Sequence, residues 1–96
     1  MASSKDFLDY VLKQLRGLHH VSYRPMMGEF LLYYNDVLFG GVYDNRLLIK
    51  KTNTNKNYIL EDDLPYDGAK PMLLVENLDD ENYLIELVKD TCRGLK

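Results

Sequence analysis

The sequence has one cysteine, no tryptophan and three prolines in 96 residues, and it contains no long apolar run. A single cysteine, Cys92, excludes an internal disulfide bond and a zinc site built on several thiolates. No segment approaches the roughly 20 apolar residues that a membrane-spanning helix needs. The first ten residues, MASSKDFLDY, lack the apolar stretch of a secretory signal. These absences predict a cytoplasmic, bacterial-type protein with no membrane contact.

Positive charge is also scarce. Lysine and arginine number 12 against 15 aspartates and glutamates, which gives a net charge of −3. Because non-specific binding to nucleic acid requires an excess of positively charged side chains, we expect no direct nucleic-acid binding. The adjacent pair His19 and His20 is not accompanied by further ligands at the spacing of a zinc site. The sequence therefore predicts no metal, no cofactor and no enzymatic activity.

What the sequence does contain is typical of one globular domain, residues 1–96, with 46% hydrophobic residues. Ser3 and Asp6 resemble a capping box at the start of a first helix. A second helix is predicted to begin at Asp79. Each carries an apolar stripe at helical spacing, formed by Phe7, Leu8, Val11, Leu12, Leu15 and Leu18 in the first and by Tyr83, Leu84, Leu87, Val88 and Leu95 in the second.

Strand signals fill the region between the helices. The dipeptides Asn35-Asp36 and Asp44-Asn45 are turn formers and separate aromatic and aliphatic runs, which predicts a three-stranded antiparallel meander. A short strand, 21–26, precedes it and another, 71–76, follows. Residues 52–70 form a polar loop, with a possible short helix around 55–60. The predicted fold is α+β with two layers, in which both helices lie on one face of an antiparallel sheet.

Strict alternation from these two turns divides the meander into two faces. The first, expected to receive the helices, holds Leu31, Tyr33, Leu38, Val42, Leu47 and Ile49. The second holds Phe30, Leu32, Tyr34, Val37, Phe39, Tyr43 and Leu48, with Arg46 and Lys50 at its border. An uncovered aromatic face of this size is typical of an interaction surface. The predicted interface residues are Phe30, Leu32, Tyr34, Phe39, Tyr43 and Arg46.

The glycine pair Gly40-Gly41 raises the question of a phosphate-binding loop. Such a loop requires a following lysine and serine or threonine that open a helix, and neither follows here. Glycine inside a strand marks a bulge or the close approach of another backbone, and we expect one of these at Gly40-Gly41.

The stretch RPMMGEFLLYYNDVLFGGVYDNRLLIK resembles the N-terminal domain of the TfoX/Sxy competence-regulator family. The residues that match the family pattern are Arg24, Met26, Gly28, Leu32, Tyr33, Phe39, Leu47, Ile49, Lys50 and Met72. The resemblance implies an α+β, secretion-chaperone-like fold and a link to the regulation of DNA-uptake competence. Met27, Glu29 and Leu31 depart from the pattern. Full-length family members carry a second, C-terminal domain. Because this sequence ends at Lys96, we expect a stand-alone N-terminal domain here. Whether another chain supplies the second domain stays open.

Two functional hypotheses follow. The first is a non-enzymatic interaction or regulatory module that contacts a protein partner, or a second copy in a homodimer, through the aromatic face. In this hypothesis Arg24 and Lys50 contact an anion or the partner. The alternative is a small-molecule-binding domain or minor enzyme that uses Arg24, Lys50 and a groove near loop 52–70. The sequence identifies neither the partner nor a ligand.

Overall fold

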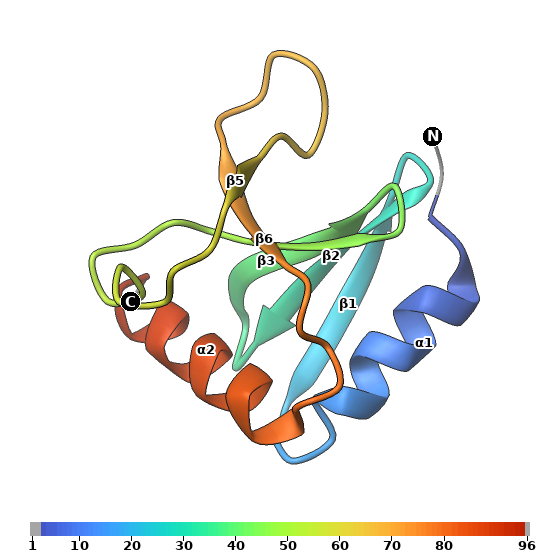
Figure 1. Cartoon of the computed structure of the whole chain (residues 1–96). Coiled ribbons are helices and arrows are strands. Elements are labelled where there is room, and N and C mark those ends of the chain that lie inside the picture. The colour runs from blue at the N-terminus through green and yellow to red at the C-terminus, as the bar shows by residue number, and fades with distance from the viewer. Residues whose placement is uncertain (1–2, 96) are drawn as a thin grey trace.

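The computed structural model describes residues 3–95. Within that range the elements are α1 (Lys5–Gln14), β1 (Val21–Met26), β2 (Glu29–Tyr34), β3 (Val37–Tyr43), β4 (Arg46–Ile49), β5 (Asp62–Asp63), β6 (Met72–Val75) and α2 (Glu81–Arg93). The described strands form one antiparallel sheet in the order β1-β2-β3-β4-β6-β5. Both helices lie on the same side of this sheet (Figure 1). The predicted two-layer α+β fold is confirmed.

Helix α1 begins one residue later than the sequence predicted. Ser4 has extended backbone angles, and its Oγ accepts a hydrogen bond from the backbone N–H of Phe7 at 3.1 Å. Ser3, the predicted cap, instead donates from its Oγ to the Glu29 carboxylate at 2.6 Å. The capping-box prediction was wrong because a tertiary contact takes the Ser3 side chain. The apolar stripe is confirmed, since Leu8, Val11 and Leu15 are buried.

Helix α2 is also capped one residue beyond the predicted start. Asp80, not Asp79, accepts a hydrogen bond from the backbone N–H of Tyr83 at 3.1 Å. The predicted core stripe is confirmed, because Leu84, Leu87 and Val88 are fully buried. Burial of side chains of this size contributes about 1.5–3 kcal/mol each, so packing stabilises α2 more than its cap does.

The two predicted turns are confirmed. Asn35, Asp36, Asp44 and Asn45 all have positive φ, between 50° and 65°, which is the backbone geometry of tight hairpins. A further turn at 27–28, with φ of 52° and 85°, connects β1 to β2. The meander therefore has four strands, β1 to β4, where the sequence predicted three. Strand β6 is confirmed, and the short β5 beside it was not predicted.

The pairing of β2 with β3 contains a β-bulge that the sequence did not reveal. Tyr34 pairs with Val37 as predicted, but Leu32 pairs with Gly40 instead of Phe39. Phe39 is thus an extra residue on β3, and alternation breaks at this point. Consequently the side chains of Phe39 and Val42 both reach the core, although their odd spacing predicted opposite faces.

The hydrophobic core lies between the sheet and the helices, and it includes most of the predicted exposed face. Leu32 and Phe39 are 0% exposed and pack in one cluster with the buried residues of α1 and α2. Phe30 and Tyr34 are half-buried against the same cluster. The prediction of which face receives the helices was therefore wrong for β2 and for residues 37–39 of β3. Both faces of β2 are apolar, and the inward face becomes evident only once the bulge is known.

The segment between β4 and β5 contains no helix among its described residues 50–61, so the helix predicted near 55–60 was wrong. Turns held by side chains replace it. Asn55 is 1% exposed, and its Nδ2 donates to Lys50 O at 2.9 Å and to Thr91 Oγ1 at 2.8 Å. Its Oδ1 accepts from the backbone N–H of Thr52 at 3.0 Å. Asn55 thereby fixes this segment against α2.

Candidate functional site

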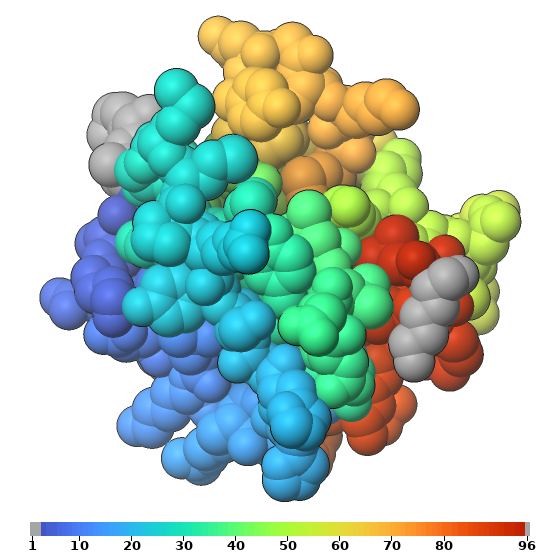
Figure 2. All heavy atoms as spheres, turned by 180° about the vertical axis from the view of Figure 1, so that it is seen from behind, coloured from blue at the N-terminus to red at the C-terminus, as the bar shows by residue number. Residues whose placement is uncertain are grey.

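The side of the sheet that faces away from the helices, here called the outer sheet face, carries the candidate functional surfaces. Its side chains include Arg24, Leu31, Tyr33, Leu38, Tyr43, Arg46 and Leu48, as the alternation along each strand and the pairing between strands require. Figure 2 shows this face, with the strands in its middle and the helices visible only at the two sides. No helix in the described chain covers it.

One end of the outer sheet face is covered by residues 64–71. Tyr43 is 7% exposed and Leu48 is fully buried, although no helix packs on this side. Pro65 is buried, and it lines a cleft together with Tyr43 and Tyr66. Burial is the largest cause that raises the pKa of Tyr43, and the nearby Tyr66 adds to it. This end of the face is therefore occupied by the chain itself.

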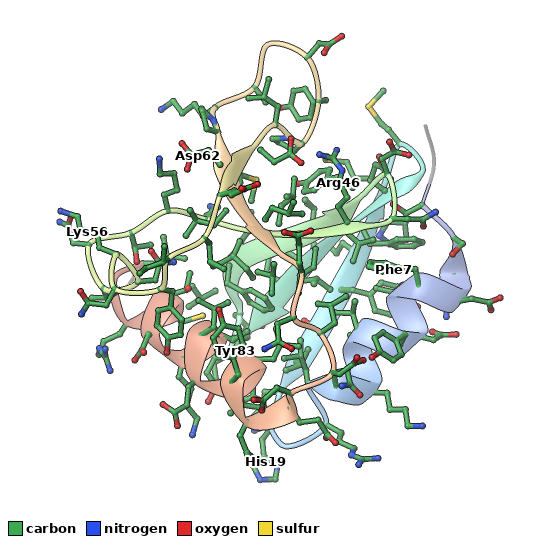
Figure 3. The ribbon with its side chains drawn as sticks, in the orientation of Figure 1. Phe7, His19, Arg46, Lys56, Asp62 and Tyr83 are labelled. Carbon is green, nitrogen blue, oxygen red and sulfur yellow. The ribbon has the colours of Figure 1, made fainter. Side chains whose placement is uncertain are left out.

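Arg46 holds the covering loop in place. Its Nη1 donates to Asp63 Oδ2 at 2.7 Å and to Leu64 O at 3.1 Å, while its Nε donates to Tyr43 O at 3.1 Å. The hydrogen bond from Arg46 is the largest cause that lowers the pKa of Asp63. Figure 3 shows Arg46 at the turn end of β4. The Arg46 guanidinium, predicted to lie at an interface, is thus used for contacts within the chain.

The other end of the outer sheet face is open. Leu31, Tyr33 and Leu38 are half-buried there, and Tyr33 pairs with Leu38 across β2 and β3. The Arg24 guanidinium lies over the Tyr33 ring, 5.9 Å from its centroid. This distance is within the range of a cation–π contact. We call the surface formed by Arg24, Leu31, Tyr33 and Leu38 the open patch.

Lys50 lies elsewhere, in a cleft between the end of β4 and residues 65–72. The cleft has a volume of about 530 Å³ and its lining includes Lys50, Lys51, Lys70, Tyr43 and Tyr66. Lys51 pairs with Asp62 at 2.8 Å. We call this site the lysine cleft. Strands β2 and β3 separate Arg24 on β1 from β4, after which Lys50 follows, so the structure does not bring the two predicted anion contacts into one site.

A larger hollow of about 910 Å³ lies on the other side of the loop, between residues 51–62 and the C-terminal end of α2. Figure 3 shows Lys56 at this loop, beside the end of α2. Several of its polar lining groups are already engaged, because Thr54 donates to Asp90 O and Asn55 bonds Thr91. Ile59 at its rim is 99% exposed. The hollow is therefore built mainly from groups that stabilise the loop.

Sequence reasoning missed most of the lysine cleft. Tyr66 and Lys70 belong to a polar loop whose path back across the sheet depends on the Arg46–Asp63 contact, which spans 17 residues. The available signal was the segment PYDGAKP, in which two prolines bracket an aromatic residue and a lysine.

Among residues 3–95, no three His, Cys, Asp or Glu side chains are grouped so that they could hold a metal ion. Neither described helix has the length and apolar run needed to cross a membrane.

Two comparisons with known proteins show what this sequence is similar to. The model of the TfoX N-terminal domain matches residues 13–93, from the last turn of α1 to the end of α2. A protein from Spirochaeta aurantia described as an "uncharacterized 12.7 kDa protein in trpE 5′ region" is 28% identical over 83 residues, which cover 84% of this chain and 72% of that protein. The family match includes the whole described sheet and extends over well more than half of the sequence. The chain therefore belongs to the TfoX N-terminal domain family.

Proposed function

We propose that this chain is a non-enzymatic regulatory module, related to competence regulation, that acts by binding a second copy of itself through the open patch. Family membership supports a regulatory, competence-related role. The observation that carries the proposed contact is the open patch itself, in which Leu31, Tyr33 and Leu38 are only half-buried on a sheet face that no described helix covers. Aromatic side chains and arginine, here Tyr33 and Arg24, are enriched at the centres of protein interfaces.

The contact is expected to join two faces rather than two sheet edges. Strand β1 lies at the edge of the sheet, and its Pro25 has no backbone N–H with which to bond another strand. Proline on an edge strand opposes edge-to-edge pairing. The open patch, by contrast, offers side chains from three neighbouring strands.

Charge supports a second copy as the partner. A twofold contact places one patch against itself, and a patch whose border carries both signs of charge can be complementary to itself. Arg24 supplies the positive charge, and Asp36, at the exposed turn between β2 and β3, supplies a negative one. In a twofold arrangement Arg24 of each copy would lie against the acidic turn of the other. Complementary charges of this kind fix orientation more than they add affinity.

Sedimentation equilibrium at tens of micromolar tests this proposal. The wild-type chain is expected to form a dimer and Tyr33→Lys a monomer, because a lysine on each copy would place like charges in the contact. Ile59→Lys is the matched control, since Ile59 is fully exposed beside the larger hollow and outside the open patch. It is expected to dimerise like the wild type. A monomeric wild type, or a Tyr33→Lys variant that dimerises normally, would overturn the proposal.

A further inference from the structure

We propose that the lysine cleft binds a small organic anion in which a planar ring carries a phosphate or a carboxylate. The proposal is independent of the open patch, because the two sites have no residue in common. It rests on three features of the cleft: its charge, a tyrosine hydroxyl that reaches solvent without an internal partner, and its shape.

The charge of the cleft is the first feature. Its lining contains Lys50, Lys51 and Lys70 and no carboxylate, in a protein whose net charge is −3. Lys51 is neutralised by Asp62. Within the described part of the chain, no carboxylate oxygen lies within 4.0 Å of the Lys50 or Lys70 ammonium group. Two uncompensated cations beside one concavity attract an anion.

The Tyr43 hydroxyl is the second feature. The residue is only 7% exposed, yet in residues 3–95 its hydroxyl forms no hydrogen bond. Polar groups of buried residues nearly always have a partner in the protein or in solvent. In the described chain no buried side-chain oxygen lacks a partner, so this hydroxyl reaches solvent, and Tyr43 is one of the residues that line the cleft. Tyr66, Glu29 and Tyr33 also lie near the Tyr43 phenol. Burial raises the pKa of Tyr43, which keeps the phenol protonated and able to donate to an anionic oxygen.

The shape of the cleft is the third feature. Its volume of about 530 Å³ lies in the range of small-molecule sites, roughly 300–1,000 Å³. Tyr43, Tyr66, Pro65 and Pro71 supply flat apolar and aromatic surfaces around the lysines. A ring would contact these surfaces while its acidic group reaches Lys50 and Lys70. An inorganic anion alone would leave the apolar surfaces unused, so the ligand is expected to need both parts.

Titrations followed by amide chemical shifts test the proposal with three probes. Phenyl phosphate carries both parts, phenol carries only the ring, and inorganic phosphate carries only the anion. Phenyl phosphate is expected to shift the amides of Tyr43, Lys50 and residues 66–72 in a saturable way at millimolar concentration. Phenol and inorganic phosphate are expected to bind more weakly than phenyl phosphate at the same residues, by about fivefold or more.

Three variants make the outcome decisive. Lys50→Gln and Lys70→Gln are each expected to weaken phenyl phosphate binding about fivefold, which is the effect of one exposed charge contact. Lys56→Gln removes a lysine of the neighbouring hollow and is expected to leave the affinity unchanged. The proposal is overturned if no shifts occur by about 10 mM phenyl phosphate, if the shifts lie outside the cleft, or if Lys56→Gln weakens binding as much as Lys50→Gln.

Discussion

Glu29 ties Ser3 to the sheet through two hydrogen bonds to one carboxylate oxygen. Glu29 Oε1 accepts from Ser3 Oγ at 2.6 Å and from the Ser3 backbone N–H at 2.9 Å. Its other oxygen accepts from the backbone N–H of Asp44 at 3.0 Å, and Ser3 Oγ in turn accepts from the Asn45 N–H at 3.0 Å. Glu29 therefore joins the start of α1 to the β3–β4 turn, at a position where this sequence departs from the family pattern.

Glu29→Ala is expected to lower the free energy of unfolding by about 1–3 kcal/mol, because three hydrogen bonds to a charged acceptor are lost in a partly exposed site. Urea denaturation measures the change. Glu76→Ala is the matched control, since Glu76 is exposed after β6 and its side chain forms no hydrogen bond or ion pair in the described chain. It is expected to change stability by less than about 0.5 kcal/mol. Equal effects of the two substitutions would contradict the role assigned to Glu29.

Gly40 is a second position where one substitution is decisive. A Cβ atom at Gly40 would lie 2.2 Å from the carbonyl oxygen of Leu48, which belongs to the paired backbone of β4 and cannot rotate away. Gly40→Ala is therefore expected to cost more than about 3 kcal/mol or to prevent folding. Gly68→Ala is the control, since no atom lies within 4 Å of its Cβ and only its φ of +83° opposes alanine. A cost of about 1–2 kcal/mol is expected there, and thermal melting distinguishes the two.

The close approach at Gly40 was predictable from sequence, whereas its consequence for the sheet was not. Turn dipeptides and helical periodicity are local signals, so the hairpins at Asn35-Asp36 and Asp44-Asn45, both helices and β6 were found. The bulge at Phe39 depends on which backbone groups pair across β2 and β3. The alternation of apolar residues in the sequence does not indicate it. Because β2 is apolar on both faces, its own pattern did not indicate which face is buried. Without the bulge, strict alternation assigned Leu32 and Phe39 to the outer face, whereas both lie in the core.

Asn55 is expected to contribute more to stability than any other polar side chain of the segment that precedes β5. It is buried and bonds Lys50 O, Thr91 Oγ1 and the Thr52 N–H. Asn55→Ala leaves those partners unsatisfied, and we expect a loss of about 2–4 kcal/mol in the free energy of unfolding. Asn57→Ala, an exposed amide two residues later, is expected to cost less than about 0.5 kcal/mol. If urea denaturation shows Asn55→Ala to be as mild as Asn57→Ala, the loop is not fixed as described.

The candidate sites were predictable in kind but not in composition. A sheet face without helices follows from the two-layer fold, and a groove beside loop 52–70 follows from its length. The residues of each surface depend on contacts between distant segments. Arg46–Asp63 folds the loop over Tyr43, which removes that ring from the predicted interface and builds the lysine cleft around Lys50. The Arg24 guanidinium lies over the Tyr33 ring in the open patch.

Tyr58 is expected to make stability fall steeply at alkaline pH. Its hydroxyl donates to Asp90 Oδ2 at 2.6 Å, and its ring meets Tyr83 edge to face with centroids 5.7 Å apart. Burial, followed by the hydrogen bond to Asp90, raises the pKa of Tyr58 from 10.0 to about 12. Both causes favour the neutral phenol in the folded chain, because a phenolate there would be poorly solvated and would lie beside a carboxylate.

The sign of the pH dependence follows from the raised pKa. Between about pH 10 and pH 12 the unfolded chain has lost the Tyr58 proton while the folded chain keeps it, so raising the pH favours unfolding. The stabilisation linked to this proton is complete below pH 10 and is lost by about pH 12.

Tyr58→Phe is expected to lower stability by about 1 kcal/mol at neutral pH and to flatten the alkaline decline. Tyr66→Phe, which removes an exposed phenol with no hydrogen bond in the described chain, is expected to keep the wild-type slope. Urea denaturation at a series of pH values from neutral to alkaline measures these slopes. Because the other tyrosines remain in both variants, a Tyr58→Phe slope equal to that of Tyr66→Phe would mean that the Tyr58 hydroxyl is not held by Asp90 in solution.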